Sequence, residues 1–235
     1  MLNCFGVAST ANIGADCALI IVMFLLTLVT LATAMWLLAK FINEEKGRNT
    51  VKYAAIVVAA GVAIRLLCAV FIGGARNDFI DYNTAIDYFV NSGVFYYYYK
   101  VGVKIYPLSF YMLALFGGLG HAFGLASGSA WLTLLVKIPY IAADAFTAVI
   151  LYRMGKRYVN SEVGTVLAAV YSLCPVFFAM SGMYGSPLAL ALPFVLLSFS
   201  SLIEKKHLTA IILYALSMLC AKETIYLYPI YLVYY

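Results

Sequence analysis

Charge is scarce in this sequence. Lys, Arg, Asp and Glu make up 11% of its 235 residues, against 65% hydrophobic residues, and the mean hydropathy is +0.97. Soluble domains carry about 25% charged residues, so this composition excludes an ordinary soluble enzyme or binding domain. The net charge of +5 comes mostly from short loops between apolar runs, not from one basic surface. We therefore expect no nucleic-acid partner.

Metal-binding and redox cysteine motifs are also missing. The five cysteines form no C-x-x-C pair and have no metal-ligand spacing: Cys4, Cys17, Cys68, Cys174 and Cys220. They are typical of small buried hydrophobic side chains. The chain shows no repeat of 20–50 residues and no Pro/Ser-rich linker, so we expect one domain over residues 1–235. The first apolar run lacks a basic leader and is too long for a signal peptide, which predicts a retained span.

Long apolar runs dominate what is present. Several approach or exceed the roughly 20 residues that cross a bilayer as a helix, and the alternating pattern of barrel strands is missing. The sequence thus predicts an all-α, polytopic membrane protein with about seven to eight apolar segments. The expected spans are 17–42, 53–73, 130–152, 163–180, 186–203 and 208–221, with further apolar segments at 105–125 and 224–235.

The distribution of Lys and Arg predicts an orientation. Most of them lie in loops 43–52, 153–162 and 204–207, which the positive-inside rule assigns to the cytoplasm. Segments 74–106 and 181–186 then lie on the outer side of a cell membrane, together with Lys222. An odd number of crossings must connect the first outer loop to Arg153. We therefore expect the proline- and glycine-interrupted run 105–125 to be re-entrant or half-crossing.

The outer loop 74–106 holds the longest polar interval. Apolar residues at Phe79, Tyr82, Ile86 and Phe89 predict an amphipathic juxtamembrane helix over about residues 79–91. Asp78 and Asp81 stand at its start. They suit a helix cap and a favourable first turn, and equally a general base or a ligand for a divalent metal ion.

Four other charged residues have both structural and functional interpretations. Arg76 can pair with Asp78 or with a phosphate. Arg65 and Asp144 lie inside predicted spans, where an isolated charge is costly, so we expect them to form a pair that is either structural or catalytic. Lys222 either pairs with its neighbour Glu223 or binds a lipid-linked phosphate.

Aromatic residues surround this interval. The run Tyr96–Tyr99 and Tyr106 are typical of a headgroup-level belt, and they also suit stacking on a sugar or a lipid. His121 has no second His or Cys at ligand spacing, so we do not expect it to bind a metal.

An ordered set of short motifs follows Arg65. They are R-L-L at 65–67, G-V-F-Y at 93–96, Y-P-L-S-F-Y at 106–111, K-I-P-Y-I-A-A-D at 137–144, L-Y-R-M-G-K-R at 151–157, Y-S-L-C-P at 171–175, Y-G-S-P-L at 184–188, and A-K-E at 221–223 with Pro229. In this order the set resembles the C-type (GT-C) membrane glycosyltransferases, especially the mannosyltransferase-like and protein O-mannosyltransferase-like branches. That resemblance implies a GT-C-like bundle of transmembrane helices.

The resemblance also implies roles for particular residues. Asp78, with Asp81, would be catalytic, and Asp78 would be the ligand of any divalent metal ion, the one cofactor considered. Arg76, Lys222 and Tyr106 would contact the phosphate and lipid of the donor. Substrate-binding roles would fall to Tyr184, Ser186 and Glu223. The implied partners are a polyprenyl-phosphate-linked sugar and membrane lipid, and the implied location is a bacterial plasma membrane rather than the endoplasmic reticulum.

Two departures from the family pattern keep other interpretations open. Leu188 stands where the family has a second acid, and Ser186 stands where it has Gln. The chain also has fewer apolar segments than the family usually has, and its last run has no polar flank, so a partner subunit covering that end is expected if the chain is not a fragment. The second hypothesis is a non-catalytic GT-C-like subunit or lipid-binding protein, and the third is a transporter.

Overall fold

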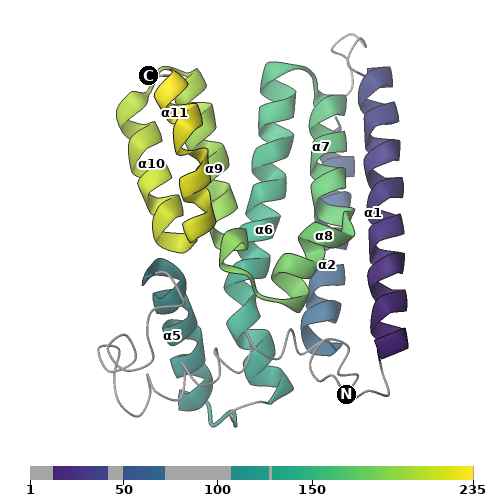
Figure 1. Ribbon diagram of the computed structural model, residues 1–235, viewed down its shortest axis with the longest axis vertical. Coiled ribbons are helices and arrows are strands. Elements are labelled where there is room, and N and C mark those ends of the chain that lie inside the picture. Colours follow the sequence, from purple (N-terminus) through teal and green to yellow (C-terminus); the bar gives the residue numbers. More distant parts are fainter. Residues whose placement is uncertain (1–12, 42–49, 72–106, 127–128, 235) are drawn as a thin grey trace.

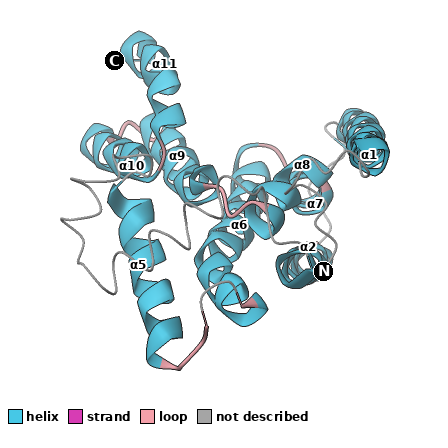
Figure 2. Ribbon diagram, turned by 60° about the horizontal axis from the view of Figure 1, so that its bottom comes forward, coloured by secondary structure: helices cyan, strands magenta, loops and turns pink. Residues whose placement is uncertain are grey.

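The structure is a computed structural model, and it describes residues 13–41, 50–71, 107–126 and 129–234. Within these ranges every regular element is a helix (Figure 2), which confirms the expected all-α class. The elements are α1 (Ile13–Phe41), α2 (Val51–Phe71), α5 (Pro107–Ala122), α6 (Ala130–Tyr158), α7 (Ser161–Leu173), α8 (Pro175–Phe178), the π-helix η1 (Ala179–Met183), α9 (Pro187–Ile203), α10 (His207–Cys220), the 3-10 helix η2 (Lys222–Leu227) and α11 (Tyr228–Tyr234).

Helix length and apolar composition mark two described helices as candidate membrane spans. These are α2 and α6, and α7 with α8 and η1 becomes a third if that bent pair is one span. The described chain therefore has membrane-spanning character, with fewer full-length candidates than the seven to eight apolar segments expected. Helices α9 and α10 match runs 186–203 and 208–221, yet their 17 and 14 residues reach only about 25 Å and 21 Å, short of about 30 Å of hydrocarbon.

The run 163–180 is not one continuous helix. It breaks at Cys174, whose ψ of 127° is extended, and the segments on either side are bent by 54°. Pro175 follows directly and starts α8. Proline has no amide hydrogen to donate to the carbonyl four residues earlier, which is the physical reason for a break at this point.

Helix α6 runs the length of the molecule between two groups of helices (Figure 1). On one side lie α1, α2 and α7, and on the other lie α9, α10 and α11, with α5 beyond the end of α10. Helices α6 and α7 approach so closely that a Cβ on Gly164 would lie 2.4 Å from the carbonyl oxygen of Tyr152. Glycine there lets the two backbones touch.

Side chains cap the helices at several starts. The Asn160 side chain accepts a hydrogen bond from the Val163 amide at 2.8 Å, and Ser129 accepts one from Leu132 at 3.2 Å. Both are typical N-caps, which satisfy amides that have no partner inside the helix. The caps explain why α6 and α7 begin where they do.

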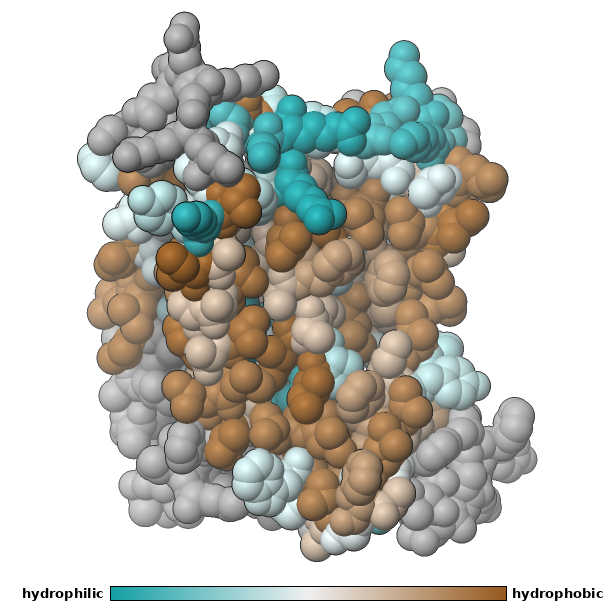
Figure 3. Space-filling model, turned by 180° about the vertical axis from the view of Figure 1, so that it is seen from behind, coloured by the Kyte–Doolittle hydropathy of each residue, from teal (hydrophilic) through white to brown (hydrophobic). Residues whose placement is uncertain are grey.

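The basic turns meet at one end of the molecule, as predicted for loops 153–162 and 204–207. Arg157, in the last turn of α6, pairs with Glu204 after α9, and Lys206 donates to the same carboxylate at 2.7 Å. The start of α2 joins them through the Thr50 hydroxyl, which donates to the Ser161 carbonyl at 2.8 Å. Figure 3 shows hydrophilic residues gathered at this end above a largely hydrophobic surface. We refer to it as the basic end.

Candidate functional site

Four of the residues assigned from the sequence lie outside the described residues. They are Arg76, Asp78, Asp81 and Tyr106. The expected juxtamembrane helix at about 79–91 and the loop 74–106 fall outside as well. The four assigned residues that are described are Tyr184, Ser186, Lys222 and Glu223.

A buried ion pair joins α2 to α6, as the sequence predicted. The Arg65 Nε lies 2.9 Å from Asp144 Oδ2, and the two side chains are 3% and 1% exposed. Each charge is thereby compensated inside an apolar region, where an unpaired charge would cost several kcal/mol. Compensation of both charges is required of a buried pair whether its role is structural or functional.

Two residues that sequence reasoning left without a role complete this cluster. The Tyr171 hydroxyl donates to Asp144 Oδ1 at 2.5 Å, and the Ser181 hydroxyl donates to Asp144 Oδ2. Arg65 Nε also donates to the Ser181 oxygen at 3.1 Å. We call Arg65, Asp144, Tyr171 and Ser181 the buried polar cluster. Residues of three separate sequence motifs, R-L-L at 65–67, K-I-P-Y-I-A-A-D at 137–144 and Y-S-L-C-P at 171–175, therefore meet at one place.

Lys137 is a second cation on the same face of α6. It precedes Tyr140 and Asp144 by three and seven residues, the spacing of side chains stacked along one helix face, and it is fully buried. Sequence reasoning quoted it only within a motif and gave it no role. The signal that could have found it is the one that found Asp144, an ionisable residue inside an apolar run.

The turn between η1 and α9 lies against this face. Gly185 has φ +60°, a left-handed conformation that glycine adopts without strain. A Cβ at that position would lie 3.7 Å from Lys137 Cγ and 3.9 Å from Tyr140 Cδ2. Residues 184–186, which we call the 184–186 turn, are thus placed next to a buried lysine.

Two residues of this turn were expected to bind substrate. Ser186 is the N-cap of α9, with its hydroxyl accepting from the Leu188 amide at 3.4 Å and its amide donating to the Met180 carbonyl at 2.7 Å. Tyr184 is half-buried and ends the π-helix. Ser186 therefore has a structural role, and binding of substrate by Tyr184 and Ser186 stays a prediction.

Lys222 and Glu223 stand at the start of η2, and both side chains are exposed. The preceding residues, Cys220 and Ala221, are buried against Tyr140 and the first turns of α9. This contact places the end of α10 at the level of the 184–186 turn. The sequence predicted that Asp78, Tyr184 and Lys222 lie on one face of the membrane. Asp78 lies outside the described residues, and the packing brings the ends that carry Tyr184 and Lys222 to one level, so their common membrane face stays a prediction.

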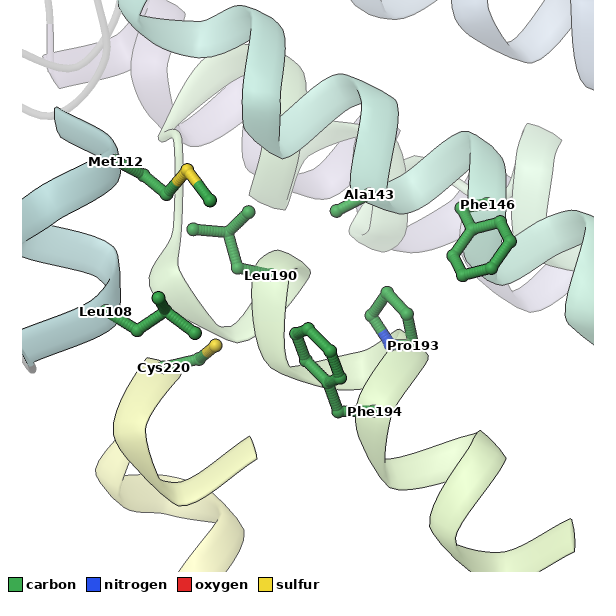
Figure 4. Close-up of a pocket in the computed structure, with 8 residues that line it drawn as sticks. All are labelled: Leu108, Met112, Ala143, Phe146, Leu190, Pro193, Phe194 and Cys220. Atoms are coloured by element: carbon green, nitrogen blue, oxygen red, sulfur yellow. The ribbon is translucent and has the colours of Figure 1, made fainter. Parts of the chain in front are cut away.

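An apolar pocket opens beside this level, between α5, α6, α9 and α10 (Figure 4). Its volume is about 160 Å³. Side chains from all four helices point into it, and none carries a charge: Leu108, Met112, Ala143, Phe146, Leu190, Pro193, Phe194 and Cys220. Ser109 on α5 fixes one wall by donating to the Cys220 carbonyl at 2.6 Å. The exposed Lys222 comes two residues after Cys220 in the chain.

Metal ligands do not gather in the part of the chain that the structure describes. No group of three or more His, Cys, Asp or Glu side chains is placed there to hold an ion. Cys68, Cys174 and Cys220 are free thiols, the last two buried. The metal role expected for Asp78 falls outside the described residues, so no chemical step below is assigned to a metal.

In the described residues, the fold and the site together define an all-α protein with helices long and apolar enough to span a membrane, a buried polar cluster and an apolar pocket. Comparisons with protein-family models, with curated proteins and with solved structures find no match.

Proposed function

We propose that this protein is a polytopic, GT-C-like glycosyltransferase that moves a sugar from a polyprenyl-phosphate donor to an acceptor on the outer face of a bacterial plasma membrane. The observation that carries the proposal is the pocket without charged side chains. Cys220 lines it, and the exposed Lys222 follows Cys220 by two residues in the chain. A polyprenyl phosphate has the same two parts, a hydrocarbon chain and an anionic head. An apolar cavity suits the first, and a cation suits the second.

The arrangement of the ends supports the orientation. The basic end holds Arg157 and Lys206, which the positive-inside rule assigns to the cytoplasm. The 184–186 turn and Lys222 then lie toward the outer half. Because α10 extends only about 21 Å from the basic end, Lys222 lies short of a full crossing, and the proposed phosphate site is recessed within the bundle.

The chemistry needs a base and a stabilised leaving group. In the proposed reaction Asp78 accepts the proton of the acceptor hydroxyl as its oxygen attacks the anomeric carbon, and the polyprenyl phosphate leaves. Lys222 and Arg76 stabilise the charge on that phosphate. Asp81, three residues after Asp78 in the sequence, supports the helix that carries the base. A divalent metal ion bound by Asp78 would add positive charge at the phosphate.

The first experiment tests transfer directly. Membranes containing the protein are incubated with labelled polyprenyl-phosphate sugars, and the product is measured. We expect Asp78→Asn to abolish transfer with expression intact, and transfer retained by this variant would refute the assignment of Asp78. If wild-type membranes show no transfer with any donor, the non-catalytic subunit replaces the enzyme as the better hypothesis.

The second experiment tests the lysine. Lys222→Ala should raise the KM for the lipid donor roughly 10- to 150-fold, because a charge-assisted contact contributes about 1.5–3 kcal/mol. The matched control is Lys156→Ala, an exposed lysine at the basic end, which should leave KM unchanged. An equal effect of both substitutions would mean that general charge, and not this site, attracts the donor.

The break between α7 and α8 is the one observation that favours a transporter, because broken spans often form substrate sites in transporters. In this protein, however, the guanidinium of Arg65 donates to the carbonyls at the break, with Nη1 lying 2.8 Å from the Ser172 oxygen. A break filled in this way offers no carbonyls to a passing ion. The filled break therefore supports the enzyme over the transporter.

A further inference from the structure

The break in the third candidate span leaves a backbone carbonyl without its helical partner. In a continuous helix the amide of residue 175 would donate to the carbonyl of Tyr171, but Pro175 has no amide hydrogen. Inside a membrane no water is present to replace that donor, so the carbonyl must be satisfied by another part of the protein. A lost hydrogen bond here would be costly.

Arg65 supplies the missing donors from the neighbouring helix. Its Nη2 lies 3.3 Å from the Tyr171 carbonyl oxygen, and its Nη1 lies 2.8 Å from that of Ser172. Gly61, one turn earlier on α2, permits the approach, since a Cβ there would lie 2.7 Å from Ser172 Cβ. The positive guanidinium also faces the C-terminal end of α7, where cations are favourable to the helix dipole.

The same arginine holds the segment beyond the break. Its Nε donates to the Ser181 hydroxyl at 3.1 Å, and that hydroxyl donates to Asp144. Gly182 lets η1 lie directly on α2, because a Cβ there would be 2.9 Å from the Arg65 carbonyl oxygen. Both arms of the bend are therefore tied to one ion pair, which is itself anchored on α6.

We infer that Arg65 and Asp144 form a positioning pair, in which Arg65 replaces the amide lost at Pro175 and the pair holds the bend that sets the 184–186 turn against Lys137 and Tyr140. The turn follows η1 directly, so the direction of η1 decides where Tyr184 and Ser186 lie. The inference rests on the proposed function only in taking that turn as part of the substrate site. Neither residue of the pair is assigned contact with substrate.

A thermal-stability cycle tests the replacement of the amide. In the double variant Arg65→Met with Asp144→Asn the pair is neutral and the carbonyls at the break lose their donors, so the melting temperature falls. Adding Pro175→Ala restores an amide hydrogen and should recover at least half of that loss. The matched control is Pro139→Ala, a proline inside the continuous helix α6, which should recover nothing. Equal recovery by both alanines would overturn the replacement role.

A more conservative substitution provides the same test if the Arg65→Met, Asp144→Asn double variant does not fold. Arg65→Lys retains the charge for Asp144, but a single ammonium cannot reach both carbonyls in the geometry of a guanidinium. Pro175→Ala should again recover stability in the Arg65→Lys background and should not raise it in the wild type. A gain of equal size in the wild type would show that Pro175 destabilises the protein by itself and that Arg65 does not compensate for it.

A distance measurement tests the bend independently of activity. Spin labels at the half-buried positions Glu162 and Tyr184, in a background with the native cysteines replaced by alanine, report the span across the break. Straightening the 54° bend should lengthen that distance by about 4 Å at 1.5 Å per residue. We expect this in the neutral-pair variant that also carries Pro175→Ala. An unchanged distance would show that the pair does not set the bend.

Kinetics then separate positioning from stability. In that stabilised but straightened variant we expect kcat for sugar transfer to fall about 100-fold, because small displacements of positioning groups are that costly. The KM for the lipid donor should change less than about threefold, since the pocket and Lys222 are untouched. Wild-type kcat in this variant would refute the positioning role. Absence of transfer in the wild type would instead refute the proposed function, and the distance result would still decide the bend.

Discussion

The two sides of α6 are held together by different chemistry. Toward α2, α7 and η1 the buried contacts include an ion pair, Arg65 with Asp144 at 2.9 Å. In the unit formed by α9, α10, η2 and α11 the buried polar contacts come from neutral hydroxyls. Tyr231 donates to Ser198 at 2.8 Å, and Tyr214 donates to the Thr224 carbonyl at 2.9 Å.

The difference follows from the state of the backbone on each side. A helix is broken in the first region, so carbonyls need donors, and a guanidinium has several. In the second region α9 and α10 are continuous, and hydroxyls have only to join whole helices to one another. The Arg65–Asp144 ion pair therefore lies where a helix is broken, whereas the contacts named within α9, α10, η2 and α11 are made by neutral hydroxyls.

Removing one charge should have the largest effect on stability. Asp144→Ala leaves Arg65 buried without its partner, and we expect a loss of about 3–5 kcal/mol in the free energy of unfolding. Asp144→Asn, which keeps acceptors for Tyr171 and Ser181, should lose less. Unfolding by denaturing detergent in mixed micelles measures both. A loss below about 1 kcal/mol for Asp144→Ala would remove the distinction between the two sides.

The ion pair was accessible to sequence reasoning, but its surroundings were not. Arg65 and Asp144 stand out because each is a charge inside an apolar run, and such charges need partners. Tyr171 and Ser181 carry no charge and lie 27 and 37 residues from Asp144 in sequence, so nothing local marks them. Only the tertiary packing of α2, α6, α7 and η1 brings them together.

The break in the span was likewise hidden, although its proline is visible. Pro139 and Pro193 lie inside the continuous helices α6 and α9, whereas the chain breaks at Pro175. The local sequence cannot distinguish these cases, because every proline removes one backbone donor and only the tertiary structure shows which helix breaks there. For the same reason the apolar run 163–180 reads as one uninterrupted span.

The candidate site could be predicted in outline. Tyr184 and Lys222 were predicted to lie toward one side. That prediction needs only the positions of the apolar runs and the distribution of Lys and Arg, which are visible in the sequence. The pocket near Lys222 could not be predicted, since its lining comes from four helices spread between Leu108 and Cys220. Nor could the capping role of Ser186, which depends on the left-handed turn at Gly185.

The close backbone contact between α6 and α7 gives a second stability test of the side of α6 that carries the ion pair. Gly164→Leu places a side chain where the Tyr152 carbonyl oxygen is 2.4 Å and the Lys156 amide is 3.0 Å from the first added carbon. The backbone must move, and we expect a loss of about 1–3 kcal/mol in the same unfolding assay. Ala142→Leu, on the exposed face of α6, is the control and should change little.

Removing a hydroxyl from the unit formed by α9, α10, η2 and α11 should lower the free energy of unfolding by less. Tyr231→Phe removes the hydrogen bond to Ser198 but keeps the ring, which stacks on Phe199 and Tyr214 with centroids 5.2 Å and 4.1 Å away. We expect a loss of about 0.6 kcal/mol, the average for buried hydrogen bonds between membrane helices. The control is Tyr226→Phe, whose side chain is 80% exposed. A loss as large as that of Asp144→Ala would contradict the comparison.

The smallest expected effect lies at the basic end, where charges meet water. A hydrogen bond from Lys206, together with the charge of Arg157, lowers the pKa of Glu204 from its ordinary value of 4.5. A lowered folded-state pKa means that this carboxylate stabilises the protein above pH 4.5, and that the contribution is lost as pH falls through the folded-state value. The melting temperatures of wild type and Glu204→Gln should therefore differ at pH 7 and converge at lower pH. The difference should be small, because exposed ion pairs contribute little. If the gap were the same at both pH values, the carboxylate would not be the cause, and charge at this end would do no more than set orientation.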